Sequence, residues 1–187
     1  MSIVRGLKVS ALAMYGIALM RLDFSSVRWM EFMIFGIAML LIADIDAAEK
    51  MIPNRILCFL VGVRTMILIA TYIQDHTLGI ETAIQAGLGV AAMSALFGLT
   101  RLIFRKRIGM GDVKLMILVG YYVGVKDGTD ILVLALFVAL FFFAHRAMSR
   151  DEENKKQNMQ EALSFGPCVA IATILLYVSR AIGTYMS

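Results

Sequence analysis

Charged residues are scarce in this sequence. Asp, Glu, Lys and Arg make up 17% of the 187 residues, whereas apolar residues make up 60%, and the mean hydropathy is +0.80. A soluble globular domain carries more charge than this on its surface. The composition therefore excludes an ordinary soluble domain and predicts an integral membrane protein that lies in a lipid bilayer.

Cysteine is scarce too, because the chain contains only Cys58 and Cys168. Both lie in apolar runs, and neither belongs to a CxxC pair or to another spacing typical of metal ligands. The sequence therefore predicts no zinc site and no disulfide framework. The basic residues are not interleaved with exposed aromatic residues, so nucleic acid is not an expected partner.

Seven apolar stretches follow one another along the chain, and we expect each of them to form a helix. A helix needs about 17–25 apolar residues to span a bilayer, and some of the shorter stretches reach this length by continuing into neighbouring polar residues. We expect an all-α, polytopic transmembrane helix bundle of six to seven spans, with six if the first stretch lies on the membrane surface. The stretches run over Leu7–Leu22, Met30–Ala43, Ile56–Ile73, Ile80–Phe104, Val113–Val125, Ile131–Met148 and Phe165–Ile182.

We expect residues 1–187 to form one membrane domain, with an additional N-terminal span and loop over 1–29 and a core over 30–187. The run Val9–Met20 follows basic residues, but no small-residue cleavage site leads from it into a polar chain. It is therefore expected to be a retained span rather than a secretory signal. The polar segment 150–161 is expected to be a loop.

The distribution of Lys and Arg predicts the orientation of the spans. If the N-terminus is cytoplasmic, twelve basic residues lie at the cytoplasmic ends of seven spans and four lie on the other side. Cytoplasmic loops carry an excess of Lys and Arg, so this bias favours the stated orientation. Arg64 and Lys114 lie within expected spans. Arg64 is expected to pair with an acid such as Glu81 or to line a polar cavity.

The first acidic motif is DIDAAEKMIPN, which covers Asp44–Asn54. Proline disfavours helix at the residue before it and suits the first turn of a helix. One span should therefore end near this motif, and the next should begin after Pro53. Asp44 and Asp46 are two residues apart and point to nearly opposite sides of a helix, so at most one should face the bundle centre.

The second acidic motif is GMGDVKL, which covers Gly109–Leu115. Gly109 and Gly111 permit close approach of another chain segment. A helix that begins at Asp112 would present free backbone N–H groups there, and aspartate is a favoured cap. For Lys114 two interpretations remain open: the ammonium group tunes the acids or binds a carboxylate, or the side chain extends to the membrane interface.

Two acid-bearing span ends on one membrane face can converge across a bundle. Ionisable groups at membrane depth are costly and tend to be functional. From the residues alone, two functions stay open. One is an aspartyl hydrolase, and the alternative is a proton- or cation-coupled membrane transporter that uses the same acids.

The two motifs, in this order, resemble those of the type IV prepilin peptidases. GMGD at Gly109–Asp112 matches the GxGD motif of that family. The family also has an aspartate seven residues before the proline of an (I/L)-P-(N/D) sequence, and Asp46 stands at this distance from Pro53. Phe165–Pro167 at the start of the last stretch is a third match. The resemblance covers residues 30–187, whereas Asp44 does not fit the spacing.

The resemblance implies a membrane aspartyl endopeptidase with Asp46 and Asp112 as catalytic residues and with no metal or other cofactor. The implied substrates are type IV prepilins or pseudopilins, whose short basic leader is removed at the cytoplasmic face of the inner (cytoplasmic) membrane. Larger family members also methylate the product and carry paired CxxC motifs. This sequence has no CxxC motif, so the resemblance implies cleavage without methylation. The residues that support the acids in the two motifs are Pro53, Asn54, Gly109, Gly111 and Lys114.

The mechanism that these residue types allow is general acid–base hydrolysis. Asp46 and Asp112 are expected to share one proton, and the sequence does not assign the acid or the base. The ionised carboxyl would activate a water that attacks the scissile carbonyl, and the protonated carboxyl would polarise that carbonyl and then protonate the leaving amine. Acids that are candidates to receive the basic leader are Glu49, Asp151, Glu152 and Glu153.

Overall fold

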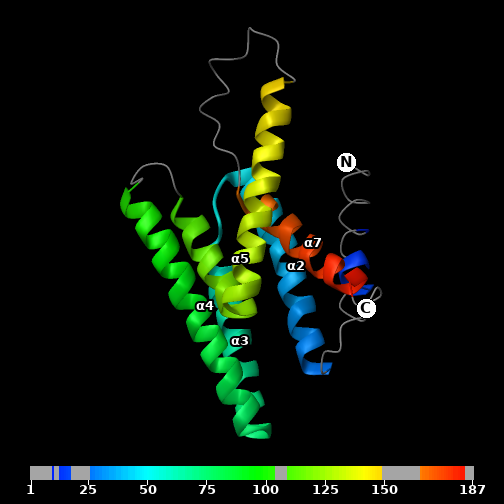
Figure 1. Ribbon diagram of the computed structural model, residues 1–187, viewed down its shortest axis with the longest axis vertical. Coiled ribbons are helices and arrows are strands. Elements are labelled where there is room, and N and C mark those ends of the chain that lie inside the picture. Colours follow the sequence, from blue (N-terminus) through cyan, green and yellow to red (C-terminus); the bar gives the residue numbers. More distant parts are fainter. Residues whose placement is uncertain (1–9, 11–12, 18–25, 104–108, 149–164, 184–187) are drawn as a thin grey trace.

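The computed structural model describes residue 10 and residues 13–17, 26–103, 109–148 and 165–183. Within these ranges every regular element is an α-helix, and the helices pack as a bundle (Figure 1). The expected all-α fold is therefore confirmed. Most of the first apolar stretch, the basic residues 105–107 and the polar segment 150–161 lie outside the described residues. The helices are α2 (Ser26–Glu49), α3 (Asn54–Gln74), α4 (His76–Ile103), α5 (Met110–Met148) and α7 (Phe165–Gly183).

Three of the described helices are long and apolar enough to cross a membrane. These segments are Asn54–Gln74, His76–Leu102 and Met110–Ala144, and Phe165–Arg180 is a shorter apolar helix. These four helices correspond to the third to seventh apolar stretches, because α5 contains both the fifth and the sixth stretch. The helical membrane bundle predicted from the composition is thus confirmed.

A short connection joins α3 to α4 at Asp75. Its backbone has φ −143° and ψ 105°, which is extended. Its carboxylate accepts hydrogen bonds from the backbone N–H groups of Thr77 (2.9 Å) and Leu78 (3.1 Å). Aspartate is a favoured N-cap because it satisfies these free donors. The two helices therefore follow each other almost without a loop and form a hairpin.

The long helix α5 is broken at Gly124, where the backbone has φ 79° and ψ −171°. Glycine adopts a positive φ readily because it has no Cβ. Residues eight apart in a straight helix are separated by about 12 Å along the axis. A Cβ at Gly128 would nevertheless lie 3.7 Å from the Cα of Gly120. The second half of α5 therefore turns back along the first half, as Figure 1 shows.

Helix α4 packs directly on the turn of α5 through glycines. A Cβ at Gly120 would lie 2.5 Å from the carbonyl oxygen of Gly89, and a Cβ at Gly89 would collide with the carbonyl oxygen of Gly120. Small residues allow this close approach of backbones in membrane bundles, where packing takes the place of the hydrophobic effect. The pair Gly89 and Gly120 thus fixes where α4 crosses α5.

Replacing Gly89 with alanine is expected to destabilise the bundle by about 1–3 kcal/mol, because a methyl group is forced into a packed backbone contact. The measurement is thermal unfolding of the detergent-purified protein, with a lowered transition temperature as the expected result. Gly87→Ala on the same helix is the matched control, since nothing lies within 4 Å of a Cβ there. Equal transition temperatures for the two variants would contradict this packing.

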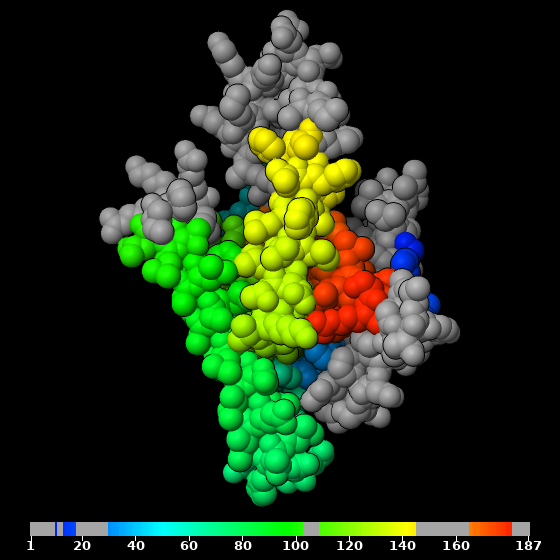
Figure 2. Space-filling view, in the orientation of Figure 1, coloured from blue at the N-terminus to red at the C-terminus, as the bar shows by residue number. Residues whose placement is uncertain are grey.

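The buried core contains side chains from all five helices, with most of them on α2, α5 and α7. Phe35 on α2 stacks on Tyr122 of α5 with ring centroids 4.4 Å apart and an interplanar angle of 19°. Large apolar side chains are instead exposed on the outer faces, among them Met66 on α3 and Phe141 on α5. Figure 2 shows the second half of α5 lying open on one face of the molecule. A bilayer accounts for these exposed faces, because acyl chains cover them.

Candidate active site

The connection between α2 and α3 has the break that Pro53 predicts. Helix α2 ends at Glu49, and Lys50 has a positive φ of 53°. The N–H of Lys50 donates to the carbonyl oxygen of Asp46 at 2.9 Å, which closes the last turn. Pro53 is extended, with φ −71° and ψ 119°, and α3 begins directly after it. The last turn of α2 thus holds Asp46 at the beginning of a sharp corner.

Asp44 and Asp46 point in different directions, as their spacing predicts. Asp44 is exposed, whereas Asp46 is buried with only 4% of its surface exposed. The Oδ2 atom of Asp46 accepts a hydrogen bond of 2.9 Å from the backbone N–H of Gly166, at the beginning of α7. The start of the last helix therefore positions this carboxylate, and the contact connects two segments far apart in the sequence.

Gly166 has no room for a side chain. A Cβ at this position would lie 2.8 Å from Oδ2 of Asp46 and 3.1 Å from its Cβ. Only glycine therefore lets α7 approach close enough for its N–H to reach the carboxylate. The sequence marked Phe165–Pro167 as part of a family pattern, but its spacing from Asp46 gave no sign of this contact.

The structure corrects one detail of the second motif. Helix α5 begins at Met110, so Asp112 lies within the first turn and does not cap the helix. Gly109 holds the cap position, and its backbone N–H donates to the carboxylate of Asp112. A side chain in the third helical position that reaches back to the cap satisfies one of the free N–H donors. A Cβ at Gly109 would lie 3.0 Å from Oδ2 of Asp112.

The structure brings the two motifs together at one end of the bundle. The charges of Asp46 and Asp112 interact with each other, and Asp112 is half-buried. A Cβ at Gly111 would lie 3.1 Å from the Cβ of Ile52, so the start of α5 packs against the corner after α2. Two carboxyl groups from different helices, one buried and one half-buried, therefore face the same small region.

Lys114 connects the motifs in a way that the sequence did not indicate. Its Nζ atom donates to Oδ1 of Asn54 at 2.9 Å, and both residues are exposed. Neither of the two interpretations of Lys114 included this partner. The contact ties the first turn of α3 to the first helical turns of α5. Within the described ranges, no three His, Cys, Asp or Glu side chains converge as a metal-binding group.

The sequence profile of the type IV leader peptidase family matches residues 33–144, more than half of the chain. The chain belongs to the type IV leader peptidase family. The matched range contains Asp46 and Asp112, so the family resemblance of the two motifs is confirmed and the protein is a membrane peptidase. No match was found among curated proteins or among solved structures.

This peptidase has an apolar groove of about 730 Å³ between α3, α4 and the first half of α5. Asn54 and Lys114, which are hydrogen-bonded to each other, lie at its edge. The rest of the lining is almost entirely apolar and comprises Leu57, Cys58, Val61, Val90, Ile117, Leu118 and Tyr121.

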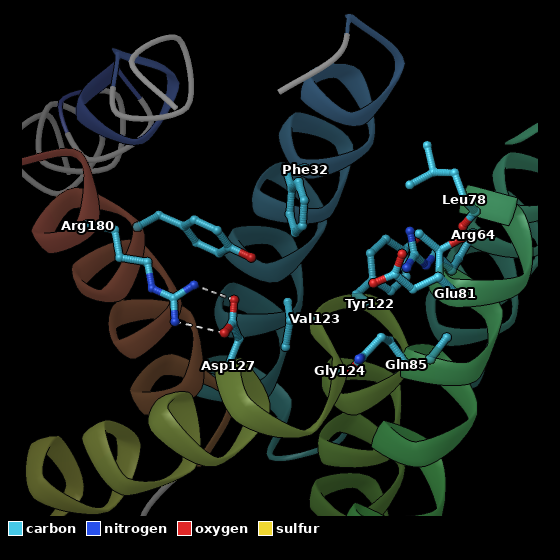
Figure 3. Close-up of a pocket in the computed structure, with 13 residues that line it drawn as sticks. Phe32, Arg64, Leu78, Glu81, Gln85, Tyr122, Val123, Gly124, Asp127 and Arg180 are labelled. Atoms are coloured by element: carbon cyan, nitrogen blue, oxygen red, sulfur yellow. Dashed lines mark hydrogen bonds and ion pairs between the residues drawn. The ribbon is translucent and has the colours of Figure 1, made fainter. Parts of the chain in front are cut away.

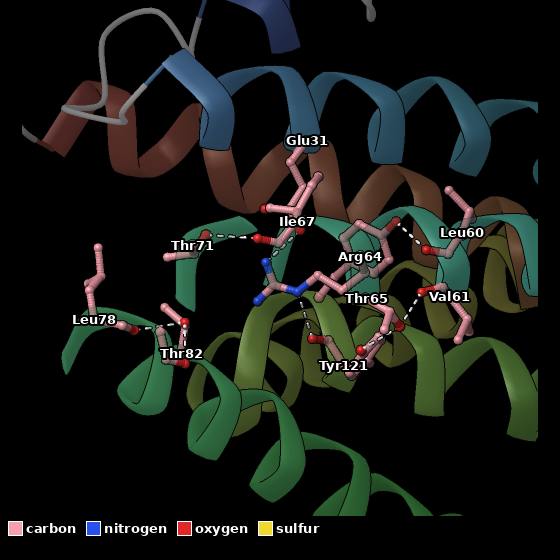
Figure 4. Close-up of polar contacts among 12 residues, drawn as sticks. Glu31, Leu60, Val61, Arg64, Thr65, Ile67, Thr71, Leu78, Thr82 and Tyr121 are labelled. Atoms are coloured by element: carbon pink, nitrogen blue, oxygen red, sulfur yellow. Dashed lines mark hydrogen bonds and ion pairs between the residues drawn. The ribbon is translucent and has the colours of Figure 1, made fainter. Parts of the chain in front are cut away.

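The structure also corrects the partner of Arg64 in this peptidase. Arg64 forms an ion pair of 2.5 Å with Glu31 of α2, and not with Glu81 (Figure 4). Its Nε donates to the carbonyl oxygen of Tyr121 at 3.3 Å, and its guanidinium lies 5.8 Å from the ring centroid of Tyr122. Glu31 lies near the start of α2, where no sequence pattern links it to the middle of α3. Arg64 also lines a polar cavity, as expected.

Proposed function

We propose that this membrane peptidase is an aspartic endopeptidase that removes the short basic leader from type IV prepilins or pseudopilins, with Asp46 and Asp112 as its catalytic pair. The observation that carries the proposal is the convergence of these two acids from α2 and α5, with their charges interacting. The family match covers both of them. Paired carboxyl groups hydrolyse peptide bonds without a covalent intermediate.

The contacts of the two acids suit a shared proton. Two nearby carboxylates do not readily ionise together, so the pair holds one proton between them. Asp46 is buried, and its Oδ2 accepts a hydrogen bond from the N–H of Gly166. Asp112 is half-buried and sits at the free start of α5, so it is the more accessible of the two to a substrate carbonyl.

The cytoplasmic location of the acids is also part of the proposal. Lys50 and Arg55 flank the corner between α2 and α3, and Arg101 lies in the last turn of α4. All three are at the same end of the bundle as the acids. Basic residues concentrate on the cytoplasmic side of membrane proteins, which supports an active site that faces the cytoplasm.

The apolar groove fits the other part of such a substrate. In prepilins an apolar helix follows the cleavage site, and the groove between α3, α4 and α5 is about 730 Å³ with an almost entirely apolar lining. Asn54 at its edge belongs to the first acidic motif and Lys114 to the second, so this edge lies at the same end of the bundle as the acids. We propose that the start of the substrate helix lies in this groove while the leader passes the acids.

The experiment that tests the function is co-expression of the chain with candidate prepilins, followed by mass measurement of the products. The expected result is a loss of mass equal to the leader, at one site just before the apolar helix. The rival function is transport by the same acids, which predicts proton or cation flux into vesicles and no shortened prepilin. Flux without cleavage of any prepilin would refute the proposal.

Four acids are candidates to receive the basic leader, and Glu49 is the one that lies within the described residues. Glu49 is exposed in the last turn of α2, one turn after Asp46. Glu49→Gln is expected to raise the KM for a prepilin by about two- to fivefold, as for an exposed ion pair, with kcat unchanged. High salt should reduce the difference from the wild type. An unchanged KM at low salt would remove Glu49 from the leader site. The other candidates, Asp151, Glu152 and Glu153, lie outside the described residues.

A further inference from the structure

The apolar groove is lined by two matching stripes of side chains, one from α3 and one from the first half of α5. In each stripe the residues stand at positions i, i+3, i+4 and i+7, which is one face of a helix. Seven residues of an α-helix rise about 10.5 Å, so each wall of the groove is two helical turns long. The stripes are Asn54, Leu57, Cys58 and Val61 on α3, and Lys114, Ile117, Leu118 and Tyr121 on α5.

Hydrogen bonds between the two helices mark both ends of the groove. At the end near the acids, Nζ of Lys114 donates to Oδ1 of Asn54 at 2.9 Å. At the far end, the hydroxyl of Tyr121 lies 2.9 Å from Oγ1 of Thr65 (Figure 4). Because the partners advance along both chains, α3 and the first half of α5 run in the same direction. The groove between them therefore has a defined beginning and end.

Tyr121, at the far end, is held at two points. A threonine hydroxyl has one proton, and that of Thr65 is donated to the carbonyl oxygen of Val61 at 2.8 Å. The hydroxyl of Tyr121 is then the donor in its bond with Thr65. Arg64 donates from Nε to the backbone carbonyl oxygen of Tyr121 at 3.3 Å. With its backbone and its hydroxyl both bonded, the tyrosine ring forms a fixed wall.

A second cavity, of about 340 Å³, differs from the groove in its chemistry. Its lining includes four charged residues, Arg64, Glu81, Asp127 and Arg180 (Figure 3). An apolar segment in this cavity would remove water from charged groups without replacing the lost hydrogen bonds, which is unfavourable. The lining of the groove is almost entirely apolar. An apolar helix therefore fits the groove and not the cavity.

We propose that the groove binds the substrate helix through three of its side chains, and that Tyr121 limits the size of the third. The inference rests on the proposed function, in which the substrate helix begins at the acid end of the groove. A helix in a groove makes contact through positions i, i+3 or i+4, and i+7, and we call these side chains the anchors. The first anchor lies at the edge formed by Asn54 and Lys114. The second lies beside Cys58, and the third meets Tyr121.

The first test is a tryptophan scan over the first three turns of the apolar helix of a prepilin. The measurement is kcat/KM for leader removal by the wild-type peptidase. We expect losses of about tenfold or more at three positions with the spacing of the anchors, because a large ring overpacks the groove. Positions between the anchors face away and are the internal controls. Similar losses at every position, or no losses at all, would overturn the proposal.

Tyr121→Ala is expected to improve cleavage of the prepilin with tryptophan at the third anchor by about tenfold, with the losses at the other two anchors unchanged. A ratio between two substrates is not altered by a general loss of stability. Val61→Ala opens the same end of the groove and serves if Tyr121→Ala does not fold. Phe59→Ala is the matched control, since Phe59 is 63% exposed on α3 and does not line the groove. A wild-type ratio in both groove variants would refute the role of Tyr121.

The second test detects occupancy of the groove without cleavage. Cys58 is exposed and lines the groove, whereas Cys168 is buried and is the internal control. In the Asp112→Asn protein, with uncleaved prepilin at about ten times its Kd, alkylation of Cys58 by a maleimide should slow by about tenfold, as the free fraction falls. A prepilin with tryptophan at all three anchors should protect Cys58 much less.

The two readouts separate this inference from the proposed function. Protection of Cys58 by a prepilin that the wild-type protein does not cleave would refute the function and support binding in the groove. Cleavage of a prepilin that leaves the alkylation rate of Cys58 unchanged would support the function and overturn the proposed binding in the groove.

Discussion

Asparagine in place of Asp112 is expected to reduce leader cleavage by about a thousandfold or more, and asparagine in place of Asp46 should have the same effect. Asparagine keeps the size of the side chain but neither takes up nor releases a proton at neutral pH. General acid–base catalysis by one side chain contributes about 10²- to 10⁴-fold to a rate. Because the two carboxyl groups act as one unit, the double variant should be little worse than either single variant.

The measurement is the rate of leader removal from a purified prepilin by each variant in detergent or liposomes. Asp44→Asn is the matched control, since Asp44 lies two residues from Asp46 but is exposed, whereas Asp46 is 4% exposed. This control should cleave at nearly the wild-type rate and excludes a general effect of charge loss at this end of the bundle. Full activity of Asp112→Asn or Asp46→Asn would refute the proposed pair. A loss of cleavage in Asp44→Asn, with Asp46→Asn still active, would show that Asp44 is the partner of Asp112.

The second large effect is expected from Gly166→Ala, although Gly166 has no reactive group. The added methyl would lie 2.8 Å from Oδ2 of Asp46, at the place where the backbone N–H now donates to it. Either the carboxylate or the start of α7 must then move. A displacement of about 1 Å at a catalytic group can cost about a hundredfold in rate. We expect a loss of that size in kcat, with little change in KM for the prepilin.

Gly98→Ala on α4 is the control for this experiment, because nothing lies within 4 Å of a Cβ at that position. Thermal unfolding of both variants distinguishes misplacement of Asp46 from loss of the fold. A folded Gly166→Ala protein with low activity supports the role of α7 in positioning Asp46. A folded Gly166→Ala protein with wild-type kcat would show that the hydrogen bond from Gly166 does not matter for cleavage.

Rules that act along the chain were sufficient for much of the fold. The helical membrane bundle follows from a sequence with 60% apolar and 17% charged residues. The corner between α2 and α3 follows from Pro53, which lacks an N–H and restricts the residue before it. The different exposure of Asp44 and Asp46 follows from the helical repeat alone. Two conclusions from the sequence stay predictions. One is the catalytic role of Asp46 and Asp112, and the other is the division into a span over 1–29 and a core over 30–187.

The predictions that were wrong concern details of geometry and partners. Asp112 was expected to cap a helix, but α5 begins two residues earlier, at Met110. Helix ends fray, so a helix start is defined only to within one or two residues. Arg64 was expected to pair with an acid such as Glu81 or to line a polar cavity; it does both, but the acid is Glu31 and not Glu81. Spacing along a helix does not indicate which of several distant acids lies opposite a given residue.

The sequence by itself thus indicated that Asp46 and Asp112 lie at helix ends on the same side of the bundle, because charge patterning and proline act locally. Only the tertiary structure decided what surrounds each acid. It placed the N–H of Gly166 on Asp46 and the ammonium of Lys114 on Asn54. These contacts join segments that are distant in sequence, and they depend on the angle at which packed helices cross. That angle is set by close backbone contacts such as that of Gly89 with Gly120, which no pattern along one helix reveals.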